Sequence, residues 1–165
     1  MGWRLNKPEK RGFSGELRMK RIGEVQFVHC TCDPCSGQRD SAEVARDTEE
    51  YYGLLLIQKG SELIRHRNSD VIAHTGEVFF WDSTLPLQFA LPDRLKKTTM
   101  FIPKTHLQRQ LIHVDELVGT VLPARTGLGA LVNANITTIG DQLQNLTGDS
   151  YTLAANLSLE LITFG

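Results

Sequence analysis

The segment from Tyr51 to Pro103 constrains the fold of this chain more than any other. Short apolar runs alternate there with turn-forming residues at Gly60, Asn68-Ser69 and Gly76-Glu77. Strands broken by turns at such close spacing are typical of antiparallel barrels and jelly rolls. Since no helix-sized segment separates one strand from the next, a parallel βαβ arrangement is disfavoured. The predicted fold is mostly β, an antiparallel β-barrel or jelly roll.

Helical spacing replaces the strand pattern towards the C-terminus. Apolar residues recur three and four positions apart from Leu128 to Leu146, and every four positions from Leu153 to Leu161. This spacing is typical of amphipathic helices. Gly148-Asp149-Ser150 between them suits the end of one helix and the N-cap of the next. The sequence therefore predicts an α-helical hairpin after the barrel.

Length and charge limit the function classes. The 165 residues, 41% of them hydrophobic, fit one ordinary domain with a core of its own. With 18 basic and 19 acidic residues, the chain has no overall field to attract nucleic acid or an anionic membrane. No apolar run approaches the roughly 20 residues that span a bilayer, and no secretory signal is recognisable. We expect a cytoplasmic protein that binds no membrane and does not itself bind DNA.

Several segments, in their order and spacing, resemble the cupin-type N-terminal sensory domain of AraC-family bacterial transcription regulators, the AraC-binding-like group. The resemblance covers Leu17 to Phe164. Its segments are Val44 to Asp47 leading into the strand Tyr52 to Ile57, the Gly60 hairpin, His74 to Glu77 opening the strand Val78 to Asp82, Leu85 to Phe89, and Met100 to Pro103.

The resemblance implies a β-barrel that binds a small organic effector, helices that form a homodimer, and a C-terminal module of two helix-turn-helix motifs that binds promoter DNA. On this basis, residues 1–16 are a flexible lead-in and 17–111 the cupin-like barrel. Residues 112–165 are then a linker and the dimerisation helices. The DNA-binding module is expected to lie beyond Gly165, outside this chain, so DNA would be reached only through it.

Aromatic residues of the central strands are the first candidates for an effector site. A barrel wide enough to leave a cavity would line it with such side chains and a few polar groups. The candidates are Tyr52, Phe80, Trp81 and Phe89. The alternative is that these four side chains belong to an ordinary core.

Charged side chains near the same strands complete the predicted site. Arg46, Arg65 and His66 are candidates to anchor a carboxylate ligand, Arg through paired hydrogen bonds. His74 is added because it could face His66 across a hairpin. Surface positions are the alternative for each of these residues.

The leucines of the helical hairpin are the candidate dimer interface. They are Leu143, Leu153, Leu157 and Leu161. One reading packs both helices on the barrel within one chain. The other presents part of the apolar surface to a second copy, and the three leucines of the last segment favour this symmetric dimer.

The sequence gives little support for a metal site or a cofactor site. A metal-dependent cupin needs two histidines two positions apart, a nearby carboxylate and a third histidine. No pair among His29, His66, His74, His106 and His113 has that spacing. We predict no metal site, no cofactor and no catalytic residues, and the alternative is a stand-alone cupin enzyme or metal-binding cupin.

Three cysteines leave one chemical question open. Cys30, Cys32 and Cys35 lie at or within a predicted loop over Thr31 to Asp40. With a fourth ligand such as His29 they would make a zinc site, but structural zinc sites usually pair two such knuckles. Zinc binding, redox chemistry and plain loop thiols all remain possible interpretations.

Overall fold

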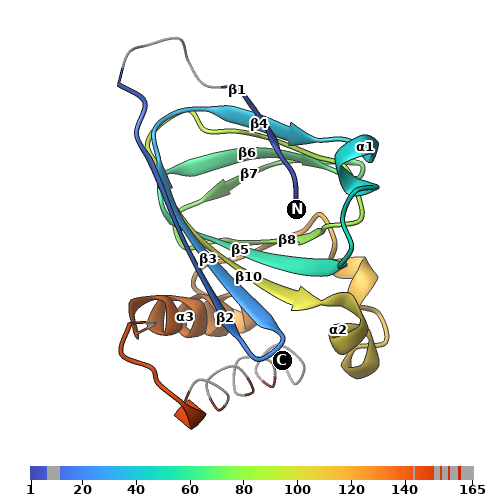
Figure 1. Ribbon diagram of the computed structural model, residues 1–165, viewed down its shortest axis with the longest axis vertical. Coiled ribbons are helices and arrows are strands. Elements are labelled where there is room, and N and C mark those ends of the chain that lie inside the picture. The colour runs from blue at the N-terminus through green and yellow to red at the C-terminus, as the bar shows by residue number, and fades with distance from the viewer. Residues whose placement is uncertain (7–11, 143, 151–152, 154–155, 157–159, 161–165) are drawn as a thin grey trace.

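Two antiparallel sheets face each other in the computed structural model, which describes residues 1–6, 12–142, 144–150, 153, 156 and 160 (Figure 1). The first sheet has the strand order β1-β4-β9-β6-β7, with bounds Arg4–Asn6, Ser36–Arg39, Leu87–Ala90, Ser61–His66 and Ser69–His74. The second has the order β11-β8-β5-β10-β3-β2, with bounds Val121–Leu122, Val78–Asp82, Tyr51–Lys59, Leu95–Pro103, Val25–Cys32 and Gly15–Ile22. The mostly β, cupin-like fold is confirmed, but the strands form two sheets rather than a closed barrel.

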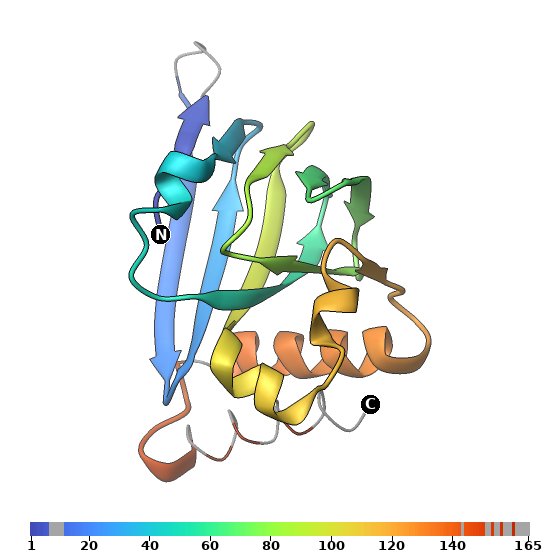
Figure 2. The same ribbon diagram turned by 90° about the vertical axis from the view of Figure 1, so that its right-hand side faces the viewer.

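Helices cover the outer face of the second sheet (Figure 2). They are α2 (Lys104–Gln110), the 3-10 helix η1 (Val114–Leu117) and α3 (Gly127–Gln142). A further short helix, α1 (Ser41–Val44), follows β4 and begins with a capping box formed by Asp40 and Glu43. The central strands β5, β8 and β10 of the second sheet are therefore covered on both faces, by the first sheet on one side and by helices on the other, whereas the edge strand β2 is mostly exposed.

Strand β5 shows how one strand contributes to two cores. All residues from Tyr51 to Ile57 are buried. Leu55 and Ile57 join the core between the sheets, whereas Leu54 and Leu56 join the core under the helices. Successive side chains of a strand point to opposite faces, so an unbroken apolar run is what a strand between two cores requires.

The predicted apolar stripe is confirmed in part: α3 ends at Gln142 rather than Leu146, and Leu131 is 51% exposed. Val132, Ile136 and Ile139 pack under the second sheet. Of the leucines predicted to form the dimer interface, Leu153 is described and is 61% exposed. Leu143, Leu157 and Leu161 lie outside the described residues, as does most of the second predicted helix. No helix of the described part is long and apolar enough to span a membrane.

Three segments differ from the expectation. The predicted loop over residues 31–40 instead holds the end of β3 and the strand β4, and the lead-in contains β1 and the start of β2. Beyond residue 111, β11 adds a strand to the second sheet by pairing with β8. In β4, Gly37 serves close packing rather than a turn, because a Cβ atom there would lie 2.6 Å from the Phe89 ring.

Candidate functional site

A cavity of about 340 Å³ lies between the two sheets. Its walls come from the inner faces of both sheets and from the N-terminal residues. Five aromatic side chains line it: Trp3, Phe13, Trp81, Phe89 and Phe101. The other lining residues are mostly aliphatic, with the cysteines and a few polar groups among them: Leu5, Leu17, Val28, Cys30, Cys32, Cys35, Leu55, Glu62, Ile64, Leu87, Leu91, Lys97 and Thr99, together with Gly15 and Glu16 at one margin.

One buried ion pair breaks the apolar lining. Glu62 on β6 is 1% exposed, and the Nζ atom of Lys97 on β10 lies 2.8 and 2.9 Å from its two carboxylate oxygens. Burial acts to lower the pKa of Lys97, but the charge of Glu62 and its hydrogen bonds outweigh burial and raise that pKa. Lys97 is therefore an ammonium group, held between Glu62 and the Phe89 ring, whose centre is 5.0 Å from Nζ.

Aromatic edges enclose the N-terminal side of the cavity. The Trp3 ring meets Trp81 at 6.0 Å and Phe89 at 5.5 Å, both edge to face. Trp3 is held from behind by Arg39, whose guanidinium lies 5.5 Å from the ring centre. Arg39 in turn donates to Asp47 at 2.5 Å and to the carbonyls of Gly2 and Ser83. This network fixes the first residues of the chain against the cavity.

His66 lies in the same inner layer but has a structural role. Its ring is fully buried, and the backbone N–H of Asp82 donates to Nε2 at 3.0 Å. Nδ1 therefore carries the proton and donates to the Pro86 carbonyl at 2.9 Å. Burial lowers the pKa of His66, so the neutral ring is favoured. With both nitrogens occupied, the ring has no free polar atom for a ligand.

The four predicted aromatic residues lie in two different places, the cavity and the helix-covered face of the second sheet. Trp81 and Phe89 line the cavity. Tyr52 and Phe80 instead lie on the helix-covered face, with their ring centres 5.4 Å apart. There the Tyr52 hydroxyl donates to Asp115 at 2.5 Å and accepts from Gln108 at 3.0 Å. Tyr52 and Phe80 belong to this second core because β5 and β8 present alternate residues to it.

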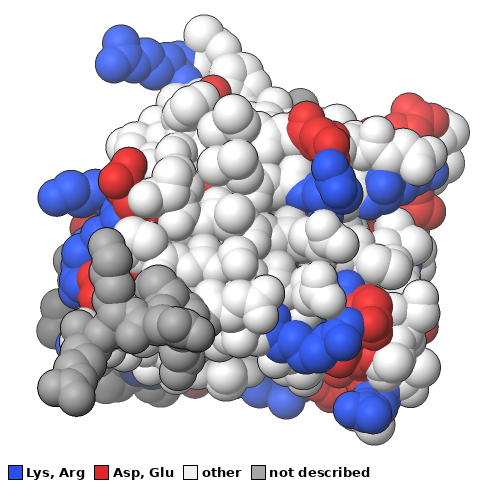
Figure 3. Space-filling model, turned by 90° about the horizontal axis from the view of Figure 1, so that it is seen from above, with Lys and Arg blue, Asp and Glu red and all other residues white. Residues whose placement is uncertain are grey.

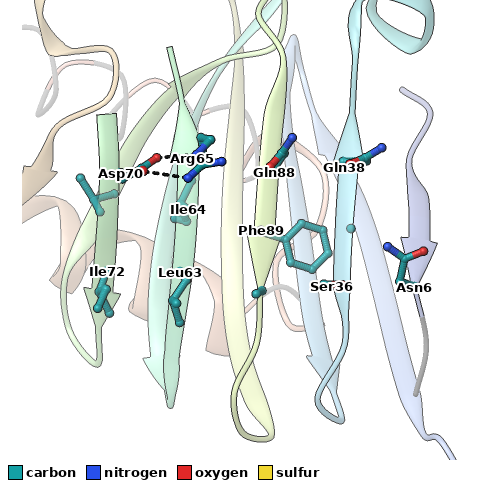
Figure 4. A pocket seen from close by; sticks show the side chains of 13 residues that line it. Asn6, Ser36, Gln38, Leu63, Ile64, Arg65, Asp70, Ile72, Gln88 and Phe89 are labelled. Atoms are coloured by element: carbon teal, nitrogen blue, oxygen red, sulfur yellow. Dashed lines mark hydrogen bonds and ion pairs between the residues drawn. The ribbon is translucent and has the colours of Figure 1, made fainter. Parts of the chain in front are cut away.

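The remaining predicted residues lie on the outside. Arg65 points away from the cavity and pairs with Asp70 across the β6–β7 hairpin through two hydrogen bonds of 2.7 and 2.9 Å (Figure 4). Arg46 and His74 are exposed. His66 and His74 do not face each other, because the register pairs His66 with Ser69 and Ser61 with His74. The structure thus brings Trp81, Phe89 and His66 together and separates the other five candidates from them.

A second hollow lies on the outer face of the first sheet. It has a volume of about 560 Å³ and is crossed by a row of outward-pointing polar residues, Gln38, Gln88, Arg65 and Asp70, one from each neighbouring strand (Figure 4). Leu63 and Ile72 form an exposed apolar pair beside this row. Seen from above, the molecule has a mostly uncharged centre with acidic and basic side chains along its margin, and its described residues form no continuous basic patch there (Figure 3). The hollow is open to solvent, whereas the cavity between the sheets is more enclosed and is lined mostly by apolar side chains, as small-molecule sites usually are.

The sequence analysis missed the aromatic residues Trp3, Phe13 and Phe101 of the cavity wall and its ion pair of Glu62 and Lys97. The sequence of β10 could have placed Lys97 at the cavity. Successive side chains of this strand alternate between its two faces, so one face holds Leu95, Lys97, Thr99 and Phe101, and the other holds the buried Met100 and Ile102. In β6 the order Glu62, Leu63, Ile64 places a charged residue inside and a leucine outside. Hydrophobic pattern alone therefore assigns Glu62 to the wrong face.

No group of three His, Cys, Asp or Glu residues in the described part of the chain is arranged to hold a metal ion. The three cysteines are free thiols at the cavity wall. They lie on β3 and in the connection to β4, rather than in the long loop that the sequence predicted.

Comparison with known proteins gives one family match. A family model described as AraC-binding-like domain matches residues 1–163. Comparison with curated protein sequences gives no significant match.

Solved structures similar to this chain include the AraC-like transcriptional activator CuxR, at a TM-score of 0.87 and 17% identity over 98% of this chain. The chain spans 60% of the length of that protein. A putative ethanolamine utilization protein EutQ from Salmonella typhimurium matches at a TM-score of 0.44 and 15% identity, over 54% of this chain and 69% of that one. A cupin superfamily protein from Desulfitobacterium hafniense matches at 0.42 and 14% identity, over 59% of this chain and 84% of that one.

Proposed function

Because this chain belongs to the AraC-binding-like domain family, we propose that it is the effector-binding and dimerisation domain of an AraC-type transcription regulator. A small organic molecule binds in the cavity between the two sheets and alters the contacts with a DNA-binding domain. Such signalling requires that the molecule bind two states of the regulator with different affinity. The domain does not catalyse turnover of the effector in this proposal.

The cavity of about 340 Å³ is the observation that carries the proposal. Its volume lies within the range of small-molecule sites, and its lining of aromatic and aliphatic side chains with one polar focus is typical of them. Thr99 and the Glu62–Lys97 pair supply hydrogen-bonding groups that would orient a polar end of the effector. An aromatic or branched aliphatic body with one polar group fits this lining best.

A thermal-shift screen of small aromatic and aliphatic metabolites tests the proposal. A compound present at 100 times its Kd stabilises the folded protein by about 2.7 kcal/mol, which raises Tm by about 5–10 °C for a chain of this size. The variant Val28→Phe adds a ring to the cavity wall, and we expect it to abolish the shift.

The matched control is Thr31→Phe, which adds the same ring to the opposite face of the same strand, outside the cavity. It should keep the ligand-induced shift. A compound whose shift is equal in both variants binds elsewhere and contradicts the cavity assignment. The absence of any shift across a broad screen would count against an effector altogether.

A further inference from the structure

All three cysteines of the chain lie on the wall of the cavity. Cys30 and Cys32 are two positions apart on β3, so their side chains point to the same face of the strand. Their sulfur atoms are 3.8 Å apart. Cys35 follows in the connection to β4 and lines the same cavity. A molecule that enters the cavity therefore meets a cluster of thiols beside aromatic rings.

The thiols of this cluster are not equivalent. The Cys30 thiol donates a hydrogen bond to the Cys32 sulfur. This bond lowers the pKa of Cys32, whereas the same bond, together with burial, raises the pKa of Cys30. Burial raises the pKa of Cys35. The ammonium group of Lys97, on the same wall, favours a negative charge at Cys32. The thiolate is the nucleophilic form of cysteine. Cys32 lines the cavity, although only 8% of its surface is exposed, and these contacts favour it as the nucleophile of the cluster.

We propose that the cavity accepts apolar α,β-unsaturated carbonyl compounds, quinones included, and that Cys32 forms a covalent adduct with them. The inference rests on the proposed effector-binding function and names a class of effector for the same cavity. Aromatic walls select the apolar body of such a molecule, and Cys32 at the wall supplies the nucleophile.

The addition needs no further reactant. The Cys32 sulfur forms a bond to the β-carbon, and the π electrons of the C=C bond move to give an enolate. The proton lost by the Cys32 thiol, returned through solvent, then binds the α-carbon. The product is a thioether, with no atom lost and no change in the count of electrons. Lys97 lies on the cavity wall and is paired with Glu62, and its positive charge favours the thiolate of Cys32.

N-phenylmaleimide, an apolar α,β-unsaturated carbonyl compound, is the probe for this inference. The intact protein is incubated with one equivalent, and intact-mass and peptide-mapping mass spectrometry follow the adducts over time. We expect a single adduct at Cys32, formed at least tenfold faster than on N-acetylcysteine at the same pH. N-phenylsuccinimide, which has the same shape without the C=C bond, should slow the reaction by occupying the cavity.

Three variants test whether Cys32 and the cavity are responsible for the fast reaction. Cys32→Ser should remove the fast phase, Cys35→Ser should keep it, and Val28→Phe should slow it by filling the cavity. Peptide mapping of the unaltered chain gives the same answer if a serine variant does not fold. First labelling at Cys30 or Cys35, or a Cys32 rate no higher than that of N-acetylcysteine, overturns the inference. If such a result accompanies reversible ligand binding that Val28→Phe abolishes, the effector-binding function stands and only the covalent step fails.

Discussion

Arg39, Arg46 and Arg65 show how strand position decides what a charged side chain does. Arg39 lies on the inward face of β4, where its side chain is fully buried and paired with Asp47. Arg65 lies on the outward face of β6 and pairs with Asp70 in solvent. Arg46 is exposed after α1. The sequence singled out the two outer arginines because they flank predicted strands, whereas Arg39 lay in a predicted loop. Removing one partner of a buried pair costs about 3–5 kcal/mol, so Arg39 is the arginine on which the fold depends.

His66 makes the stability of the domain depend on pH. Burial holds its pKa in the folded state below the ordinary value of 6.5. As pH falls through about 6.5, the unfolded chain takes up a proton at this residue that the folded protein does not. The free energy of unfolding should therefore decrease from pH 7.5 to pH 5.5, a window above the titration of ordinary carboxylates. Urea unfolding at both pH values measures the decrease, to which the partly buried His29, whose pKa is also lowered, contributes.

The variant His66→Asn should shrink this decrease, although it lowers stability at both pH values by leaving the Asp82 N–H without its acceptor. His74→Asn, at an exposed position of the neighbouring strand, is the control and should leave the decrease unchanged. An unaltered pH dependence in His66→Asn would show that His66 is not the group responsible.

At the scale of elements, strands were predictable and their inward faces were not. The strands β5 to β10 follow the apolar runs and turns that the sequence shows, because turn chemistry is local. Successive residues of a strand face opposite sides of the sheet, so an error of one residue in the assignment exchanges the cavity face with the other face. In β5 and β8 apolar residues occupy both faces, so no pattern distinguishes Trp81 at the cavity from Phe80 under the helices. Fold class was therefore predictable, whereas only part of the candidate site was.

Helix α3 depends on its buried stripe more than on its own helix propensity. Ile136 is fully buried under the second sheet. Replacing a buried isoleucine by alanine costs about 2–5 kcal/mol through lost burial and a residual cavity. We expect Ile136→Ala to lower the free energy of unfolding by this amount, measured by urea unfolding. Leu131→Ala, on the same helix at a position that is 51% exposed, should change it by less than about 1 kcal/mol. Equal effects of the two changes would contradict the assigned face of α3.

The whole molecule consists of two cores that share the second sheet. One core surrounds the proposed effector cavity, and the other joins the same strands to α2, η1 and α3. A ligand that shifts strands β5, β8 or β10 therefore acts on residues that also contact the helices. Interiors are close-packed and transmit such displacements. This shared sheet gives a physical route from the cavity to the face that the helices cover.

The homodimer remains a prediction. Leu153 exposes 61% of its surface, an apolar area that a second copy would cover in a symmetric contact with Leu157 and Leu161. We expect sedimentation equilibrium at micromolar concentration to give the mass of two chains. The double change Leu153→Glu and Leu157→Glu would introduce charges into the predicted interface, and it should yield monomers with unchanged β-sheet circular dichroism. Ile112→Glu, at an apolar position that is 92% exposed, is the matched control and should stay dimeric. If the unaltered chain is a monomer at these concentrations, or if Ile112→Glu dissociates it equally, the leucines of the last segment are not the interface.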